Sequence, residues 1–228
     1  GAWQLHGAFH KKVRKQRKLQ ADGGATQQRQ REAAKEAARI AAQTGDKYAE
    51  FLAEGARYAS ELDWRKAGKA YREAIALRPD EPEAYFNLGA ALSNSGHNVE
   101  AAPRYLEARE RYPEGSLDWA KATAYSFNML MHKECAEVAK PEWWNDEGLK
   151  ALSARVLRAA PNEALAHSMR AIVLSVKSDL WGAGPRSAAE LKKAATYFDR
   201  AAALSRAPAV KAVYARFAAT CGSRAEAM

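Results

Sequence analysis

The chain has 228 residues, and 47% of them are hydrophobic, which is enough to bury the core of a globular protein. Lys and Arg number 36 against 27 Asp and Glu, so the net charge is +9. No segment approaches the ~18 uninterrupted apolar residues of a membrane span, which excludes a membrane-spanning class. Alanine is abundant and no alternating β-branched runs occur, so the sequence predicts an all-α protein.

Most of the positive charge lies near the start of the chain. Residues 1–47 hold eleven Lys or Arg against four acids, which is +7 of the +9. We interpret residues 1–22 as a basic N-terminal arm. It is either a solvated tail or an electrostatic contact for nucleic acid or another anionic surface, whereas the lack of any Ser before Ser60 disfavours a targeting presequence. Its core, "KKVRKQRK", contains Lys11, Lys12, Arg14, Lys15, Arg17 and Lys18.

A third hypothesis for the arm rests on "LHGAFHKKVRK" at 5–15, which resembles a degenerate calmodulin-binding IQ motif. Leu5, Phe9 and Val13 stand where that motif has hydrophobic anchors, and Lys15 stands at its final basic position. Three other positions depart from the motif. The resemblance implies a calmodulin-like partner as an alternative to an anionic surface.

After the arm, the predicted helices follow one another with short breaks. Gly24 and the glycine before it predict a break in the helical pattern. Thr26 is the predicted N-cap of a helix over 27–43, and Gly45 is predicted to end that helix. We assign 23–45 to a linker and this leading helix. From Asp46 onward, helices of about 12–16 residues recur between polar breaks.

Two consecutive segments carry the same residue types at a spacing of 34 positions. This pattern resembles the tetratricopeptide repeat (TPR), which has an aromatic residue, glycine, alanines and a closing proline at these offsets. Small residues let paired helices approach closely, and the tyrosines fill the space between hairpins. Phe51, Gly55, Tyr58, Ala67, Tyr71, Ala74 and Pro79 correspond in turn to Tyr85, Gly89, Leu92, Ala101, Tyr105, Ala108 and Pro113.

The resemblance implies a right-handed solenoid of about four antiparallel helix hairpins over 46–228. The third hairpin begins at the expected spacing, with Trp119 at 34 residues after Tyr85. An insertion near 135–148 then shifts its second helix toward the C-terminus, so that this helix ends at Pro161. A fourth hairpin is predicted near 163–204, and a final helix near 208–220 would cap the stack.

The resemblance further implies a concave groove, lined by the first helix of each hairpin, that binds a peptide segment or a partner helix. Asparagine amides there can hydrogen-bond a peptide backbone without reading its sequence. We therefore expect a non-catalytic interaction adaptor, scaffold or assembly subunit; the alternative is a nucleic-acid or ribonucleoprotein-associated protein anchored by its basic N-terminal arm. The candidate groove residues are Leu52, Ala56, Phe86, Asn87, Ala90, Asn94, Lys121, Ala124 and Asn128.

One specialised form of this groove, the carboxylate clamp of co-chaperones, fits the sequence poorly. The clamp needs five Lys, Asn or Arg ligands, and only Asn87 and Lys121 match. Leu52, Ala56 and Leu117 stand at the other positions. Since each charge-assisted bond contributes about 1.5–3 kcal/mol, the missing ligands make clamp binding weak.

No motif for chemistry stands out. The two cysteines form no C-x-x-C pair, the five histidines show no metal-ligand spacing, and phosphate-loop and nucleophile-elbow motifs are absent. We expect no catalytic residue, metal or cofactor, and an intracellular compartment in which thiols stay reduced, the cytoplasm or, as the alternative, an organelle. The tryptophans of the insertion, Trp143 and Trp144, and Trp181 are predicted to pack against the fold rather than to anchor a partner.

Overall fold

The computed structural model describes residues 24–176 and 180–228, in two compact units with the boundary after Pro79. The basic arm, with its six clustered cations and its calmodulin-like segment, lies outside the described residues. Within the described ranges the regular elements are helices and no strand occurs, so the all-α prediction is confirmed. None of the described helices combines the length and the hydropathy needed to cross a membrane.

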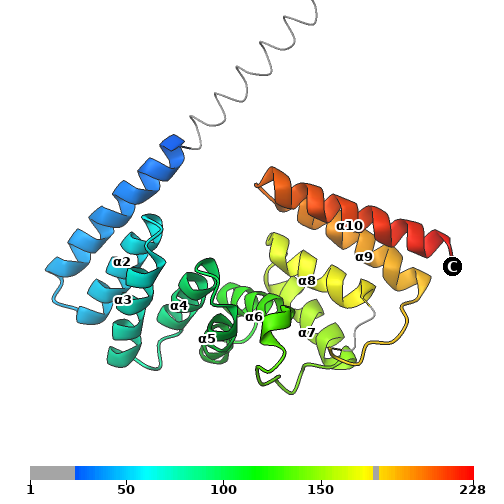
Figure 1. Ribbon diagram of the computed structural model, residues 1–228, viewed down its shortest axis with the longest axis horizontal. Coiled ribbons are helices and arrows are strands. Elements are labelled where there is room, and N and C mark those ends of the chain that lie inside the picture. The colour runs from blue at the N-terminus through cyan, green and yellow to red at the C-terminus, as the bar shows by residue number, and fades with distance from the viewer. Residues whose placement is uncertain (1–23, 177–179) are drawn as a thin grey trace, which may run out of the picture. The chain divides into compact units, whose positions relative to one another are not determined.

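The N-terminal unit contains a helix over 24–43, α2 (Lys47–Ser60) and α3 (Trp64–Leu77) (Figure 1). Asp46 caps α2 by accepting hydrogen bonds from the backbone amides of Tyr48 and Ala49 at 3.0 and 3.3 Å. The leading helix already includes residues 24–26, so Thr26 is not its cap, whereas the rest of the predicted break lies outside the described residues. A helical glycine costs only about 1 kcal/mol, so Gly24 does not exclude a helix in which Ala34, Ala38 and Ala41 are half-buried.

The C-terminal unit consists of successive antiparallel helices that pack against their neighbours in chain order (Figure 1). The contacts pair α4 with α5, α6 with α7 and α8 with α9, and α10 packs along α9. The predicted hairpins of a TPR-like helical repeat are therefore present. The elements are α4 (Pro82–Asn94), α5 (Asn98–Arg111), α6 (Leu117–Leu130), the short η1 (Lys133–Cys135), α7 (Asp146–Ala159), α8 (Ala164–Ser175), α9 (Ala188–Leu204) and α10 (Pro208–Glu226).

The repeated residue types form the core of the hairpins. The second-helix alanines of both repeats are fully buried, and Tyr71 and Tyr105 are 3% and 1% exposed. Gly89 faces the Tyr105 ring, so that a Cβ at this glycine would lie 3.1 Å from the ring carbons. The glycine and the tyrosine therefore fit together, which explains their joint recurrence after 34 residues.

Substitution of Gly55 by alanine tests this fit in the N-terminal unit. The new Cβ would overlap the ring of Tyr71, and we expect a loss of about 1–3 kcal/mol in the free energy of unfolding, as for other overpacked cores. Gly222→Ala in α10 is the matched control, because a Cβ there meets nothing within 4 Å and should stabilise the helix by about 0.5–1 kcal/mol. Urea denaturation measures both; equal effects would show that the glycine does not serve helix contact.

The insertion folds back onto the C-terminal unit, as predicted for its tryptophans. Trp144 and Trp181 are 7% and 4% exposed, and their ring centroids lie 5.8 Å apart and within 6.1 Å of the Phe127 ring. The Trp144 indole N–H donates to the backbone oxygen of Leu180 at 2.8 Å. This hydrogen bond joins two residues that are 36 positions apart in the sequence, so the insertion and the loop before α9 pack together.

A network of ion pairs also connects the insertion and the start of α7 with the loop before α9. Arg186, whose side chain is 1% exposed, donates to both carboxylate oxygens of Asp146 at 3.0 and 2.6 Å. Lys150 joins Asp146 to Glu190, with distances of 3.1 and 2.7 Å from its Nζ. The hydrogen bond from Lys150, followed by the one from the Ser187 backbone, holds the pKa of Glu190 at about 2, and the Arg186 hydrogen bonds lower the pKa of Asp146.

This network predicts an acid-sensitive C-terminal unit. The pKa of Glu190 is lower in the folded chain than its ordinary value of 4.5, so its contribution to stability is present above about pH 4.5 and is lost as the pH falls toward 2. We expect Glu190→Gln to lower the melting temperature at pH 6 and to flatten its decrease between pH 5 and 2. Thermal denaturation across this range measures the slope, with the exposed Glu137→Gln as control; parallel curves for wild type and Glu190→Gln would contradict the assignment.

Candidate functional site

A pocket of about 270 Å³ opens between the first helices of three hairpins in the C-terminal unit. Helix α4 contributes one side chain, α6 contributes four, and the remainder come from the end of α7 and the start of α8. We name this site the inter-hairpin pocket. It is lined by Phe86, Ala120, Lys121, Ala124, Tyr125, Ala160, Glu163, Leu165 and Ala166.

Aromatic rings form one wall of the inter-hairpin pocket. The ring centroids of Phe86 and Tyr125 lie 5.5 Å apart in an edge-to-face arrangement, and both rings contact Tyr105 of α5, at 5.4 and 5.2 Å. Tyr105 is buried whereas Tyr125 is 38% exposed. Burial raises the pKa of both tyrosines, so their hydroxyls stay protonated at neutral pH. A rigid aromatic surface thus faces solvent beside four small alanine side chains.

The rim of the pocket carries one lysine that is flanked by two carboxylates. Lys121 lies 3.9 Å from Asp118 on its own helix and 3.8 Å from Glu163 at the start of α8. Exposed ion pairs of this kind contribute little, about 0–1 kcal/mol. Because two carboxylates already flank Lys121, the rim does not present the free cation that a carboxylate clamp requires.

The structure brings three of the nine predicted groove residues together in one pocket. Phe86, Lys121 and Ala124 line the pocket. Asn87, Ala90 and Asn128 are half-buried, and Asn94 is exposed, with its amide donating to the oxygen of Ala90 at 2.8 Å. Leu52 is half-buried and Ala56 is exposed, both on α2 of the N-terminal unit.

Several lining residues were not among the predicted groove residues. Ala120 lies 34 positions after Phe86, so the repeat spacing could have found it. Tyr125 stands 34 positions after the buried Ala91, and that register indicates a core position rather than a pocket wall. Glu163, Leu165 and Ala166 come from the fourth hairpin, whose first helix departs from the repeat pattern, and therefore carried no signal.

The chemistry of the inter-hairpin pocket is that of a binding surface. Its lining offers aromatic rings, methyl groups and one ion pair, without a nucleophile placed beside a general base. Among the described residues no group of three or more His, Cys, Asp or Glu could hold a metal ion. Such an arrangement can accept a large apolar side chain and desolvate it.

The fold and this surface define an all-α helical-repeat protein. Comparison with family models matches residues 55–96 to the TPR repeat, a segment that runs from Gly55 across α3 and α4. This match supports a TPR assignment for that segment, and the 34-residue pattern and the paired helices agree with it. A search of curated proteins finds no relative that matches. TPR repeats generally mediate protein–protein interaction and are typically non-catalytic modules.

Proposed function

We propose that the chain is a non-catalytic adaptor or assembly subunit that binds a peptide segment of a partner protein in the inter-hairpin pocket. The observation that carries the proposal is the aromatic wall of the half-buried Phe86 and the exposed Tyr125 beside the alanines of α6. A volume of about 270 Å³ accommodates one large apolar side chain. Burial of such a side chain contributes about 1.5–3 kcal/mol, which is a substantial part of a peptide's affinity.

The amides of Asn87 and Asn128 support an extended peptide beside this anchor. They lie on α4 and α6, the helices that supply the aromatic wall. In the described parts of the chain their side chains make no hydrogen bond with other residues, and both are half-buried. An asparagine amide donates and accepts at once, so each can bond a peptide backbone. The partner would then be selected by its apolar anchor rather than by a terminal carboxylate.

Selection of peptides from a random displayed library on the immobilised chain tests this proposal. We expect the selected peptides to share a Leu, Met, Phe or Trp at one position, and their binding to be lost with Ala124→Leu, which fills the pocket. Ala203→Leu, the same change at an exposed alanine of α9, should leave binding unchanged. If no peptide is selected, or if both variants bind equally, the pocket is not the binding site.

A second candidate function belongs to the basic arm, with six cations in eight residues. Such a density can neutralise several phosphates, and the affinity would fall steeply as salt rises. Replacement of Lys11, Lys12, Arg14 and Lys15 by Gln should then abolish binding to a labelled RNA or DNA at low salt. Binding that is unchanged by these substitutions, or absent from the wild type, removes this candidate.

A further inference from the structure

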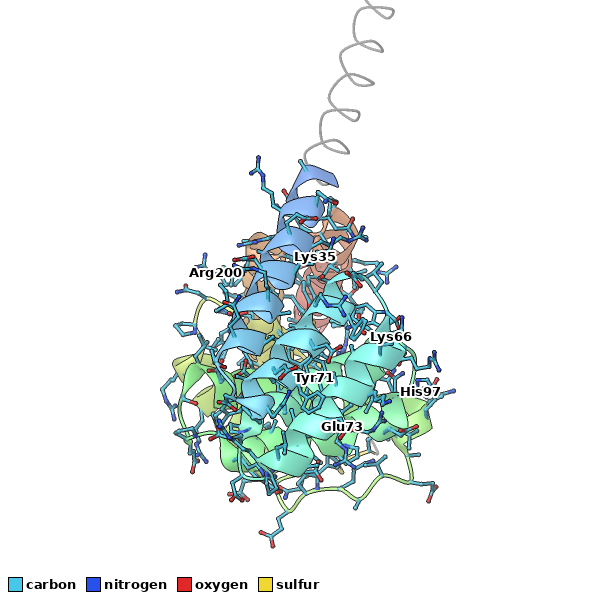
Figure 2. All side chains as sticks on the ribbon, turned by 90° about the vertical axis from the view of Figure 1, so that its left-hand side faces the viewer. Lys35, Lys66, Tyr71, Glu73, His97 and Arg200 are labelled. Carbon is cyan, nitrogen blue, oxygen red and sulfur yellow. The ribbon has the colours of Figure 1, made fainter. Side chains whose placement is uncertain are left out.

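A second and larger pocket, of about 470 Å³, lies in the N-terminal unit between α2 and α3. None of the residues that line it belongs to the leading helix over 24–43. Figure 2 labels two of them, Lys66 and Glu73, on α3. We name this site the α2–α3 pocket. It is lined by Phe51, Glu54, Tyr58, Arg65, Lys66, Lys69, Ala70 and Glu73.

The repeat pattern shows what fills the same position elsewhere in the chain. Trp119 of the third hairpin corresponds to Phe51, two repeats of 34 residues earlier. Trp119 is 2% exposed because it lies against helix α5, whose Arg109 guanidinium is 5.8 Å from its ring centroid. Phe51, in contrast, is only half-buried and faces the open pocket. The position that α5 covers in the third hairpin is thus left open by the described residues of the first.

An aromatic ring completes the covered position in the third hairpin. The Arg109 guanidinium lies 5.3 Å from the ring centroid of Trp143 and also stacks on Trp119. The backbone of Trp143 contacts Gly148 on α7, where a Cβ would lie 2.7 Å from the Trp143 oxygen. Gly148 corresponds to Lys66 when the insertion is added to the repeat spacing. The backbone at Trp143 therefore lies against the α7 position that corresponds to Lys66, which lines the α2–α3 pocket.

The charges of the α2–α3 pocket favour an acidic occupant. Helix α3 carries four Lys or Arg and a single acid. Lys66 is paired with Asp63 at 2.9 Å, whereas Arg65 and Lys69, one turn apart, have no ion pair among the described residues and are exposed. Glu54 lies 3.8 Å from Arg57, and Glu73 stands one turn beyond Lys69. The cationic end of the pocket is therefore the turn of Arg65 and Lys69.

We propose that the α2–α3 pocket docks an acidic amphipathic helix of a partner protein, with an aromatic side chain of that helix inserted against Phe51. The carboxylates of the helix lie over Arg65 and Lys69, and the ring enters beside Tyr58. The α2–α3 pocket and the inter-hairpin pocket share no lining residue, so a substitution in one leaves the lining of the other unchanged.

Binding of synthetic helical peptides to the full chain tests the docking site. The probe is a labelled 14-residue peptide with a central Trp and flanking Glu residues, compared with its Trp→Ala and Glu→Lys counterparts by fluorescence anisotropy. We expect the acidic Trp peptide to bind, and Lys69→Glu and Arg65→Glu each to weaken it by about threefold or more. The exposed Lys193→Glu on α9 changes the net charge equally and should leave affinity within the error.

Each other outcome overturns the proposal. If the wild type does not bind the acidic Trp peptide, the docking site does not exist. If the Glu and Lys peptides bind equally, the charges of the pocket do not select the peptide. If Lys69→Glu and Lys193→Glu weaken binding equally, the peptide is attracted only by the net positive charge of the protein. Equal binding of the Trp and Ala peptides would show that no ring enters the pocket. Ala124→Leu should not affect this binding, so failure here is distinguishable from failure of the inter-hairpin pocket.

Discussion

Removal of the Asp146 carboxylate is expected to destabilise the C-terminal unit by about 3–5 kcal/mol, the effect of leaving a buried charge without its partner. The Arg186 guanidinium is 1% exposed and donates to both oxygens of this carboxylate. Its Nε donates to the backbone oxygen of Val176 at 3.1 Å, which cannot neutralise the charge. Asp146→Ala should therefore be among the most destabilising substitutions outside the repeat core, as measured by urea denaturation.

A double substitution separates the charge from the packing. Replacement of both partners, Asp146→Ala with Arg186→Met, should recover at least about 1 kcal/mol of the loss, because an apolar pair tolerates burial. The exposed Asp199→Ala on α9 controls for loss of a carboxylate and should change stability by less than about 0.5 kcal/mol. A double variant no more stable than Asp146→Ala would show that the ion pair is not what closes the two loops.

Tyr105→Ala is expected to cost about 3–5 kcal/mol, as for other large aromatic side chains removed from a core. Tyr105 is 1% exposed, faces Gly89, meets the Phe86 ring edge to face and stacks on the Tyr125 ring. Its loss should also remove the support of the aromatic wall. Tyr105→Phe keeps the ring and should remain within about 1 kcal/mol of the wild type in the same denaturation experiment; equal losses for both variants would contradict a packing role.

The hairpin core could be predicted from the sequence because its signal is local and repeated. A glycine, a tyrosine and two alanines at fixed spacing specify close helix contact, and these residues are buried as expected. The insertion near 135–148 was detectable because the proline that ends the third hairpin, Pro161, lies about 14 residues later than the 34-residue spacing predicts. Helix ends were less predictable: α10 continues through Gly222 to Glu226, beyond the predicted end at 220, because one helical glycine costs little.

The loop contacts and half of the pocket could not be predicted, since they join residues without a shared periodicity. Arg186 and Asp146 are 40 positions apart in irregular segments or at a helix start, and Leu165 lies in a helix that departs from the repeat pattern. Lys121 shows a further limit. The repeat spacing marks it as a cation for a partner, whereas the structure places it between Asp118 and Glu163.

The proposed function depends on direct contact between an apolar anchor of the partner and the inter-hairpin pocket. A double-mutant cycle measures that contact: the dissociation constants of a selected peptide and of its anchor→Ala form, each for the wild type and for Ala124→Leu. We predict that either change alone weakens binding by about tenfold or more, and that the two together weaken it hardly further. Multiplicative losses would show that the anchor and the pocket do not touch, and would contradict the proposed function.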